Sequence, residues 1–293
     1  MAITASMIKE LRERTGAGMM DCKKVLTETN GDMDADVDEL RKKGAAAAEK
    51  KAGRIAAEGV IVSASDGSNG VLLEVNCETD FVAKDENFKA FSQNAANAAL
   101  ANSIEDIDSL ANAEIEGGQS VEAARQELTT KIGEKISVRR VAFTKAGDNI
   151  VSTYLHGTRI GVMVQLAGGD DALGRDLAMH IAATRPLCVS ENEMDPAVLE
   201  KEKEIFKAQA AESGKPADII EKMVGGRINK FLKENTLLGQ PFVKNPDQTV
   251  AALLKEKSAE VVSMVRFEVG EGIEKRADDF VAEVMAQAGT AND

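Results

Sequence analysis

The side chains that most often carry out chemistry are few and widely scattered in this sequence. Thiols and imidazoles are limited to three cysteines and two histidines: Cys22, Cys77, Cys188, His156 and His180. Their spacing matches neither a disulfide framework nor a zinc site, since both need residues that recur at short, defined intervals. Neither histidine has an evident nucleophile partner. We therefore expect free reduced cysteines, no bound metal and no cofactor.

Signatures of nucleotide binding and of hydrolysis are also missing. The run Ser213-Gly214-Lys215 lacks the upstream glycine of a phosphate-binding loop and falls between two predicted helices. No glycine-rich dinucleotide motif follows a strand, and no Gly-x-Ser-x-Gly elbow is present. A net charge of −13 repels phosphate backbones, and the absence of tryptophan weakens any base-stacking surface. These features argue against an enzyme and against direct nucleic-acid binding.

The distribution of apolar residues predicts a cytosolic protein. No apolar run approaches the roughly 18 residues that a membrane span needs. The first 14 residues carry five charges, at Lys9, Glu10, Arg12, Glu13 and Arg14, where a signal peptide would need an apolar stretch. We expect neither a membrane association nor a secretory signal.

Residues 1–54 predict a small three-helix domain followed by a linker. One helix stops at Thr15-Gly16, a second runs from Met19 to Glu28, and Asp32 caps a third that ends before Gly44. Residues 45–58, rich in alanine and lysine, are interpreted as a linker, and a helical conformation of it is left open. So small a core is marginally stable, which favours a domain that gains stability on binding a partner.

The middle of the chain predicts a duplicated α+β core. Apolar residues alternate over residues 60–65 and 71–75 around a turn at 66–69, which indicates a β-hairpin. Helices follow over Asn87–Ala101 and Val121–Ile132, and then a strand over Ile136–Phe143. The run from Gly161 to Leu166 repeats the pattern of residues 70–75 and precedes a helix over Leu173–Ala183, while Val261–Val269 repeats the last strand.

An antiparallel helical hairpin interrupts the second copy. Asp195-Pro196 starts one helix, Ser213-Gly214 ends it, and Pro216 starts another. The apolar residues expected to face one another are Val198, Ile205 and Phe206 against Ile220, Val224, Ile228 and Phe231. Their coiled-coil spacing favours a hairpin that packs on itself, and homodimerisation through it is the alternative. A short C-terminal helix is expected over Asp278–Ala288.

These elements divide the chain into five parts. The predicted parts are an N-terminal three-helix domain and linker (1–54), a first core subdomain (55–147), a second core subdomain (148–194 and 235–272), an inserted coiled-coil hairpin (195–234) and a C-terminal module (273–293).

The segment from Cys77 to Asp85 joins a predicted strand to a predicted helix and is expected to be a polar loop. It contains Phe81 followed by Val82, and apolar pairs of this kind are unusual in loops, which run over the surface. One interpretation folds Phe81 back into the core. The other leaves its ring exposed as a contact for another molecule.

Motifs along nearly the whole chain resemble the elongation factor Ts family, in the family's order. They are Leu11-Arg-Glu-Arg-Thr-Gly-Ala-Gly-Met-Met-Asp-Cys-Lys-Lys24, Thr79-Asp-Phe-Val82, Lys131-Ile-Gly-Glu134, His156-Gly-x-Arg159-Ile-Gly161, Gly239-Gln-Pro-Phe-Val243 and Arg266-Phe-Glu-Val-Gly-Glu-Gly272. Each motif alone is modest, and together they are specific. The resemblance implies a factor that binds elongation factor Tu and accelerates the release of its GDP.

The resemblance also implies roles for individual residues. Thr79, Asp80, Phe81 and Val82 would form the segment that disturbs the Mg²⁺ site of elongation factor Tu, with Asp80 and Phe81 as the wedge. Residues that would contact this partner are Arg12, Met19, Met20, Lys23, Ile132, Gly133, His156 and Val243. Lys244 stands where the family often has an apolar residue, so the resemblance does not imply a partner contact for this position.

A different class of function remains as an alternative at this point. The N-terminal helices resemble a ubiquitin-associated module, so a protein-interaction scaffold or a holdase is the second interpretation. Such a protein would need an exposed apolar groove and many partners. A stoichiometric complex with one translational GTPase would exclude it.

Overall fold

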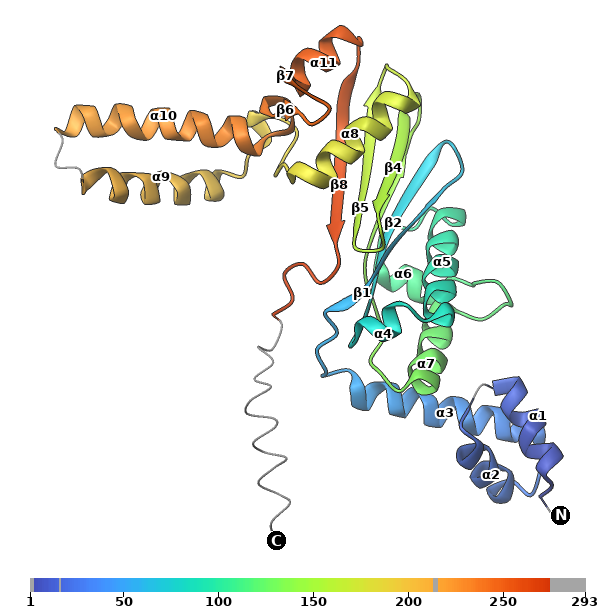
Figure 1. The fold of residues 1–293 in the computed structure, drawn as a ribbon. Coiled ribbons are helices and arrows are strands. Elements are labelled where there is room, and N and C mark those ends of the chain that lie inside the picture. Colours follow the sequence, from blue (N-terminus) through green and yellow to red (C-terminus); the bar gives the residue numbers. More distant parts are fainter. Residues whose placement is uncertain (1–2, 16, 213–215, 275–293) are drawn as a thin grey trace.

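The computed structural model of this chain describes residues 3–15, 17–212 and 216–274. Helices lie at one end, two sheets and their covering helices form the centre, and a pair of long helices projects from the other end (Figure 1). The predicted α+β class is confirmed. The predicted helix over Asp278–Ala288 lies outside the described residues. None of the helices in the described part combines the length and the apolarity that crossing a bilayer requires.

Three helices form the N-terminal end: α1 (Ala5–Thr15), α2 (Met19–Glu28) and α3 (Met33–Lys51). They share a small apolar core built around the buried side chains of Leu11, Ala17, Cys22, Val25, Leu26 and Leu40. The Asp32 side chain accepts hydrogen bonds from the N–H groups of Asp34 and Ala35, which confirms the predicted cap of α3.

The predicted end of the third helix at Gly44 is wrong, because α3 continues to Lys51. The four alanines after Gly44 have the highest helix propensity of any residue, and they carry the helix forward. Gly44 has a packing role instead. A Cβ atom there would lie 3.2 Å from Oγ1 of Thr130, so glycine allows α3 to lie closely across α7 (Val121–Ile132).

The first sheet has the strand order β1-β2-β3 and is antiparallel throughout. Its strands are β1 (Glu58–Ser65), β2 (Asn69–Cys77) and β3 (Ser137–Lys145). The helices α5 (Glu86–Ala101) and α7 cover one face, and the apolar cluster between helices and sheet is the largest in the described chain. A short helix that the sequence analysis missed, α6 (Ile107–Asn112), also packs there.

The second sheet repeats this arrangement with the strand order β4-β5-β8. It consists of β4 (Ile150–His156), β5 (Ile160–Ala167) and β8 (Glu260–Glu268), and α8 (Asp171–Thr184) packs against β4 and β5. In both sheets the middle strand leads to the covering helix, as the duplication predicted. The short elements η2 (Leu237–Gly239), β6 (Pro241–Phe242), β7 (Asn245–Thr249) and α11 (Val250–Glu256) complete this half.

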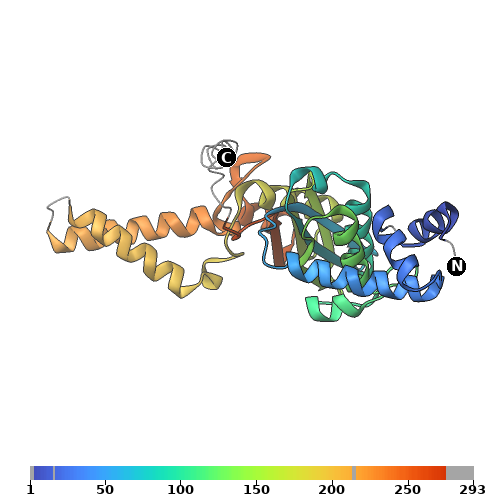
Figure 2. The ribbon, with the colours of Figure 1, turned by 90° about the horizontal axis from the view of Figure 1, so that it is seen from below.

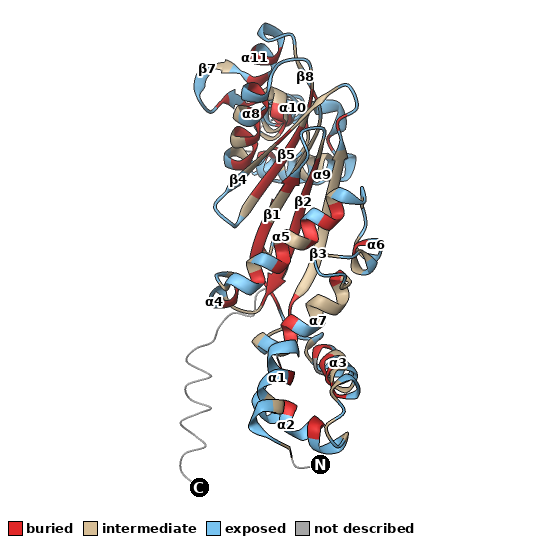
Figure 3. Cartoon of the chain, turned by 90° about the vertical axis from the view of Figure 1, so that its right-hand side faces the viewer, coloured by how far each residue is buried: buried red, intermediate tan, exposed pale blue. Residues whose placement is uncertain are grey.

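The two sheets pack face to face, so β2 and β5 are buried on both sides (Figure 3). Side chains from both sheets, including Ile61, Leu72, Met163 and Phe267, form the cluster between them. Gly161 is required by this contact, because a Cβ atom there would lie 2.4 Å from a methyl group of Ile61. The core is therefore four layers deep: helix, sheet, sheet and helix.

The helices α9 (Pro196–Ala211) and α10 (Ala217–Asn235) form the projecting hairpin (Figure 2). A 3₁₀ turn, η1 (Glu191–Glu193), precedes them. The hairpin buries its own apolar face, as predicted, but with partly different residues. The packed residues are Leu199, Phe206, Ala210, Ile220, Val224, Ile228 and Leu232.

The predicted positions Val198, Ile205 and Phe231 are wrong for this seam. Each lies next in sequence to a residue that is in it, and one step along a helix turns the side chain by roughly 100°. Ile205 is exposed as a result. The spacing of apolar residues gave the correct kind of element but not its rotation about the axis.

Candidate functional site

Phe81 is exposed, and the interpretation that placed its ring in the core is wrong. The side chain is 81% exposed, whereas the next residue, Val82, is buried in the cluster under the first sheet. The predicted loop contains a short helix, α4 (Asp80–Ala83), which begins directly after β2 and lies at the surface (Figure 3). Because neighbouring helical positions point in different directions, burying Val82 turns Phe81 outward.

The start of α4 is held by its cap. The hydroxyl oxygen of Thr79 accepts a hydrogen bond from the N–H of Val82, 3.4 Å away, so Thr79 is the N-cap residue. The Asp80 carboxylate forms an ion pair with Lys84 at 2.7 Å, and both groups are exposed. Exposed pairs of this spacing contribute only about 0.3–0.5 kcal/mol. Asp80 can therefore leave Lys84 at little cost when another charge approaches.

Two glutamates join the α4 segment to the chain after α7. The Glu134 carboxylate accepts hydrogen bonds from the N–H groups of Glu78 and Thr79, at 3.1 and 3.0 Å, and from the Thr79 hydroxyl at 2.7 Å. In return, Glu78 accepts from the N–H of Lys135 at 2.6 Å. The partners are 55 to 57 residues apart in sequence. Sequence reasoning included Glu134 only as part of a motif and gave it no role.

Ile132 and Gly133 lie immediately before Glu134, at the end of α7. Ile132 is half-buried against the first core, and Gly133 ends the helix with a φ of 89°, a conformation that favours glycine. The hydrogen bonds of Glu134 bring these two predicted contact residues beside the Phe81 segment. The structure thus joins the two parts of the predicted site into one surface.

The N-terminal helices expose all four of their predicted contact residues. Met19 and Met20 are 60% and 75% exposed, and Arg12 and Lys23 are exposed as well. Adjacent helical positions cannot both face the core, so at least one of the two methionines has to face solvent, and the structure exposes both. The inward positions of α2 are taken by Cys22, Val25 and Leu26, which leaves no room in the core for either thioether.

His156 and Val243 belong to the second half of the core and are both exposed. His156 ends β4, and its Nδ1 lies 3.3 Å from the Tyr154 hydroxyl. Val243 follows β6, and its N–H donates to Nδ1 of His180 at 3.1 Å. Lys244, at the unusual position, pairs with Asp176 on α8.

The buried His180 holds the backbone at Val243, a role that sequence reasoning did not foresee. Its Nδ1 accepts from Val243, so in the neutral ring Nε2 carries the proton and donates to Oε1 of Gln240, 2.9 Å away. Burial lowers the pKa of His180, and the bond to Gln240 opposes this shift only in part. The imidazole is therefore neutral at pH 7 and serves as a structural support.

The chemically reactive side chains of the described residues form neither a metal-binding cluster nor a disulfide. No group of three or more His, Cys, Asp or Glu side chains could hold a metal ion across residues 3–15, 17–212 and 216–274. Cys22 and Cys77 are buried, and none of the three cysteines is in a disulfide. Burial, with a smaller effect of Glu134, raises the pKa of the Cys77 thiol to about 12, so this thiol stays protonated and unreactive.

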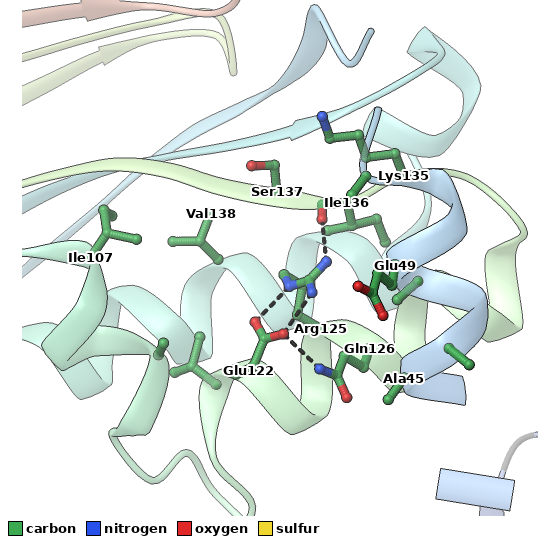
Figure 4. A pocket seen from close by; sticks show the side chains of 15 residues that line it. Ala45, Glu49, Ile107, Glu122, Arg125, Gln126, Lys135, Ile136, Ser137 and Val138 are labelled. Carbon is green, nitrogen blue, oxygen red and sulfur yellow. Dashed lines mark hydrogen bonds and ion pairs between the residues drawn. The ribbon is translucent and has the colours of Figure 1, made fainter. Parts of the chain in front are cut away.

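A cavity of about 550 Å³ lies between α3, α6, α7 and the start of β3 (Figure 4). Its main charged group, Arg125, is already paired with Glu122 at 2.6 Å and donates to the carbonyl oxygen of Ile136. Gln126 donates to the same carboxylate. None of the predicted contact residues lines this cavity. Glu49 and Lys135 also line the cavity, and the Lys135 ammonium donates to the carbonyl oxygen of Arg54.

Comparison with known proteins gives one consistent result. The profile of the family described as "Elongation factor TS" matches residues 78–271, which include the Phe81 segment, residues 132–134, His156 and Val243. Three similar proteins are each named Elongation factor Ts. The one from Alkalilimnicola ehrlichii is 58% identical over 98% of this chain and 99% of its own length. That from Methylococcus capsulatus is 57% identical over 98% and 99%.

The third, from Nitrosospira multiformis, is 58% identical over 99% of this chain and 97% of its own length. All three alignments cover nearly the whole of this chain and of each relative. The motifs, the fold and these comparisons lead to the same conclusion: this chain belongs to the elongation factor Ts family of translation elongation factors.

Proposed function

We propose that this chain is a guanine nucleotide exchange factor of the cytosol, which binds elongation factor Tu·GDP and promotes release of the GDP without covalent chemistry. The observation that carries the proposal is Phe81, an aromatic ring 81% exposed at the tip of a capped turn. Burying an apolar ring that is exposed to this degree against another protein lowers the free energy of the complex.

The mechanism needs only differential binding. In a GTPase, Mg²⁺ bridges the phosphates and keeps near-ideal octahedral geometry, so a small displacement of its surroundings weakens nucleotide binding. In this proposal Phe81 inserts beside the Mg²⁺ site of elongation factor Tu, and Asp80 either orients the turn or competes with the groups that surround the ion. The factor then binds the loosened state better than the GDP-filled state, which shifts the population toward release.

The remaining exposed residues supply affinity in the same proposal. Ile132 and Gly133 support the Phe81 contact, and Arg12, Met19, Met20 and Lys23 bind the nucleotide-binding domain. His156 and Val243 contact the third domain of elongation factor Tu. By linkage, bound GDP lowers the affinity of the factor for elongation factor Tu, and the bound factor lowers the affinity of GDP for elongation factor Tu by the same ratio.

The test is stopped-flow release of a fluorescent GDP from purified elongation factor Tu. The release rate should rise with the concentration of this chain and then saturate. Repeating the titration with Mg²⁺ removed by a chelator tests the mechanism, because a factor that acts through the Mg²⁺ site loses most of its effect once the ion is gone. Release that is not accelerated at any concentration would refute the proposed function. A stable one-to-one complex would also exclude the holdase alternative.

A further inference from the structure

The turn that presents Phe81 is too short to hold its own shape. The helix α4 has four residues, and isolated helices of fewer than about 12 residues are marginal in water. Its orientation must therefore come from contacts with the rest of the protein. On one side, burial of Val82 supplies such a contact. On the other side, the structure offers the carboxylate of Glu134.

Glu134 acts on the residue that starts the turn. Thr79 uses its hydroxyl twice: it donates the proton to Glu134 at 2.7 Å, and its oxygen accepts from the N–H of Val82 at 3.4 Å. The bond to Glu134 fixes the rotation of the hydroxyl, and this leaves the oxygen lone pairs directed at the first turn of α4. Glu134 also accepts hydrogen bonds from the backbone N–H groups of Glu78 and Thr79, just before the turn.

The same contacts join three separate segments. Glu78 accepts from the N–H of Lys135 and forms an ion pair with Arg54 at 3.3 Å, while the Lys135 ammonium donates to the carbonyl oxygen of Arg54. Residue 54 lies just beyond α3, in the connection from the N-terminal helices to β1. Hydrogen bonds and an ion pair thus connect three segments: the Phe81 turn, the end of α7 at residues 132–133, and the connection to the N-terminal helices.

We propose that Glu134 is a positioning residue for nucleotide exchange, which holds the α4 turn so that the Phe81 ring is directed outward before the partner arrives. This inference rests on the proposed function. A preorganised ring loses less conformational freedom on insertion, so Glu134 acts on the GDP-release step more than on initial binding. The side chain works through its hydrogen bonds rather than through its charge.

Two substitutions separate hydrogen bonds from charge, because both remove the negative charge. Glu134→Gln keeps the geometry: its amide oxygen can accept from both N–H groups, and its NH₂ can donate to the Thr79 oxygen. Glu134→Ala keeps none of these bonds. In the stopped-flow assay, Glu134→Ala should lower the saturating release rate about ten-fold, a loss of about one decade from an ordered turn, and change the half-saturating concentration less. Glu134→Gln should stay within about two-fold of the wild type, as expected from retained hydrogen bonds.

A matched control is Glu116→Ala, which removes an exposed glutamate between α6 and α7 and should leave the release rate unchanged. Equal losses in Glu134→Gln and Glu134→Ala would overturn the proposal, since charge would then be the cause. A wild-type saturating rate in a folded Glu134→Ala protein would overturn it too. If Glu134→Ala does not fold, the pair Thr79→Val and Thr79→Ser asks the same question, and equal rates for these two would refute it.

A second readout does not depend on exchange. The chain contains no tryptophan, so Phe81→Trp introduces a single indole at the tip of the turn. Its fluorescence anisotropy should fall when Glu134→Ala is added and should stay unchanged with Glu134→Gln or Glu116→Ala. Unchanged anisotropy with Glu134→Ala would refute the positioning role even if exchange fails for another reason. Conversely, a wild-type chain that never accelerates GDP release would refute the proposed function while this measurement still tests the turn.

Discussion

Replacing Phe81 by alanine separates a contact residue from a core residue, because the two roles predict opposite effects on stability. Truncating a buried phenylalanine costs about 3–5 kcal/mol of unfolding free energy, from lost burial and the cavity left behind. Phe81 is 81% exposed in the free protein, so only a small part of this loss applies. Phe88 on α5 is fully buried and provides the comparison within the same segment of chain.

The main free-energy loss of Phe81→Ala should occur in the complex with elongation factor Tu, where the ring is buried. Full burial of a side chain of this size is worth about 1.5–3 kcal/mol. Since about 1.4 kcal/mol corresponds to a factor of ten, Phe81→Ala should slow GDP release from elongation factor Tu by roughly ten- to a hundred-fold. Asp80→Ala should cost less if Asp80 acts only by orienting the turn, because its ion pair with Lys84 is exposed.

The assay pairs stopped-flow release of fluorescent GDP with a thermal melt of each variant. Phe88→Ala should melt far below the wild type, which shows what loss of a core ring looks like in this fold. Leu187→Ala removes an apolar side chain that is 58% exposed elsewhere on the surface, and it should change neither measurement. A Phe81→Ala protein that melts normally and exchanges at the wild-type rate would refute the wedge, and one that unfolds would mean that the ring supports the fold.

Four further predictions follow from the same structure. The purified chain should bind neither GDP nor GTP in isothermal calorimetry, because it has no phosphate-binding loop and a net charge of −13. Replacing residues 196–234 by a short Gly/Ser loop should leave a folded protein that still releases GDP, since hydrogen bonds such as Leu237 N–H to the Cys188 carbonyl hold the base of the hairpin without it. Changing Met19 and Met20 to alanine should weaken the complex while saturating protein still accelerates release, because both thioethers are exposed. The unfolding free energy should fall as pH drops from about 6.5 toward 5. Burial lowers the pKa of His180 in the folded protein, so over this range the histidine is protonated in the unfolded chain before it is protonated in the folded one.

Each of these predictions has a contradicting outcome. Micromolar nucleotide binding by the isolated chain would contradict the first. A hairpin replacement with normal circular dichroism and no exchange would show that α9 and α10 are required. If the double methionine variant gave no acceleration at saturation, the N-terminal helices would contribute more than affinity. For His180, the control is His180→Asn: this variant should lose the pH dependence between about 5 and 6.5, and an unchanged slope would assign that dependence to other groups.

The local elements of this fold could be predicted because their signals lie within a few residues of one another. The cap at Asp32, the turn at residues 66–69 and the proline at the start of α9 are all local features, and the structure has each of them. The repeat of residues 70–75 in 161–166 likewise predicted that the two sheets share an arrangement. Helical spacing alone required at least one of the two N-terminal methionines to be exposed, and the structure exposes both.

Features that depend on packing between distant segments could not be read in this way. The rotation of the hairpin helices about their axes was predicted one residue out of phase at Val198 and Phe231, because apolar residues occupy more than one face. Gly44 was interpreted as the end of a helix, whereas its contact with Thr130 on α7, 86 residues away along the chain, gives it a packing role. Glu74 is fully buried between Arg139 and Arg140, which follow it by 65 and 66 positions, so its burial also depends on packing between distant segments.

By itself, the sequence determined the class of the fold, the duplicated core and, through its motifs, the family. Only the tertiary structure decided which way Phe81 points and what holds it there. The choice between core and surface was open in the sequence, because an apolar residue in a loop fits both. It was settled by the burial of Val82 and by Glu134, whose partners are 55 and 56 residues away along the chain. The antiparallel pairing of β2 with β3 brings these two distant segments together.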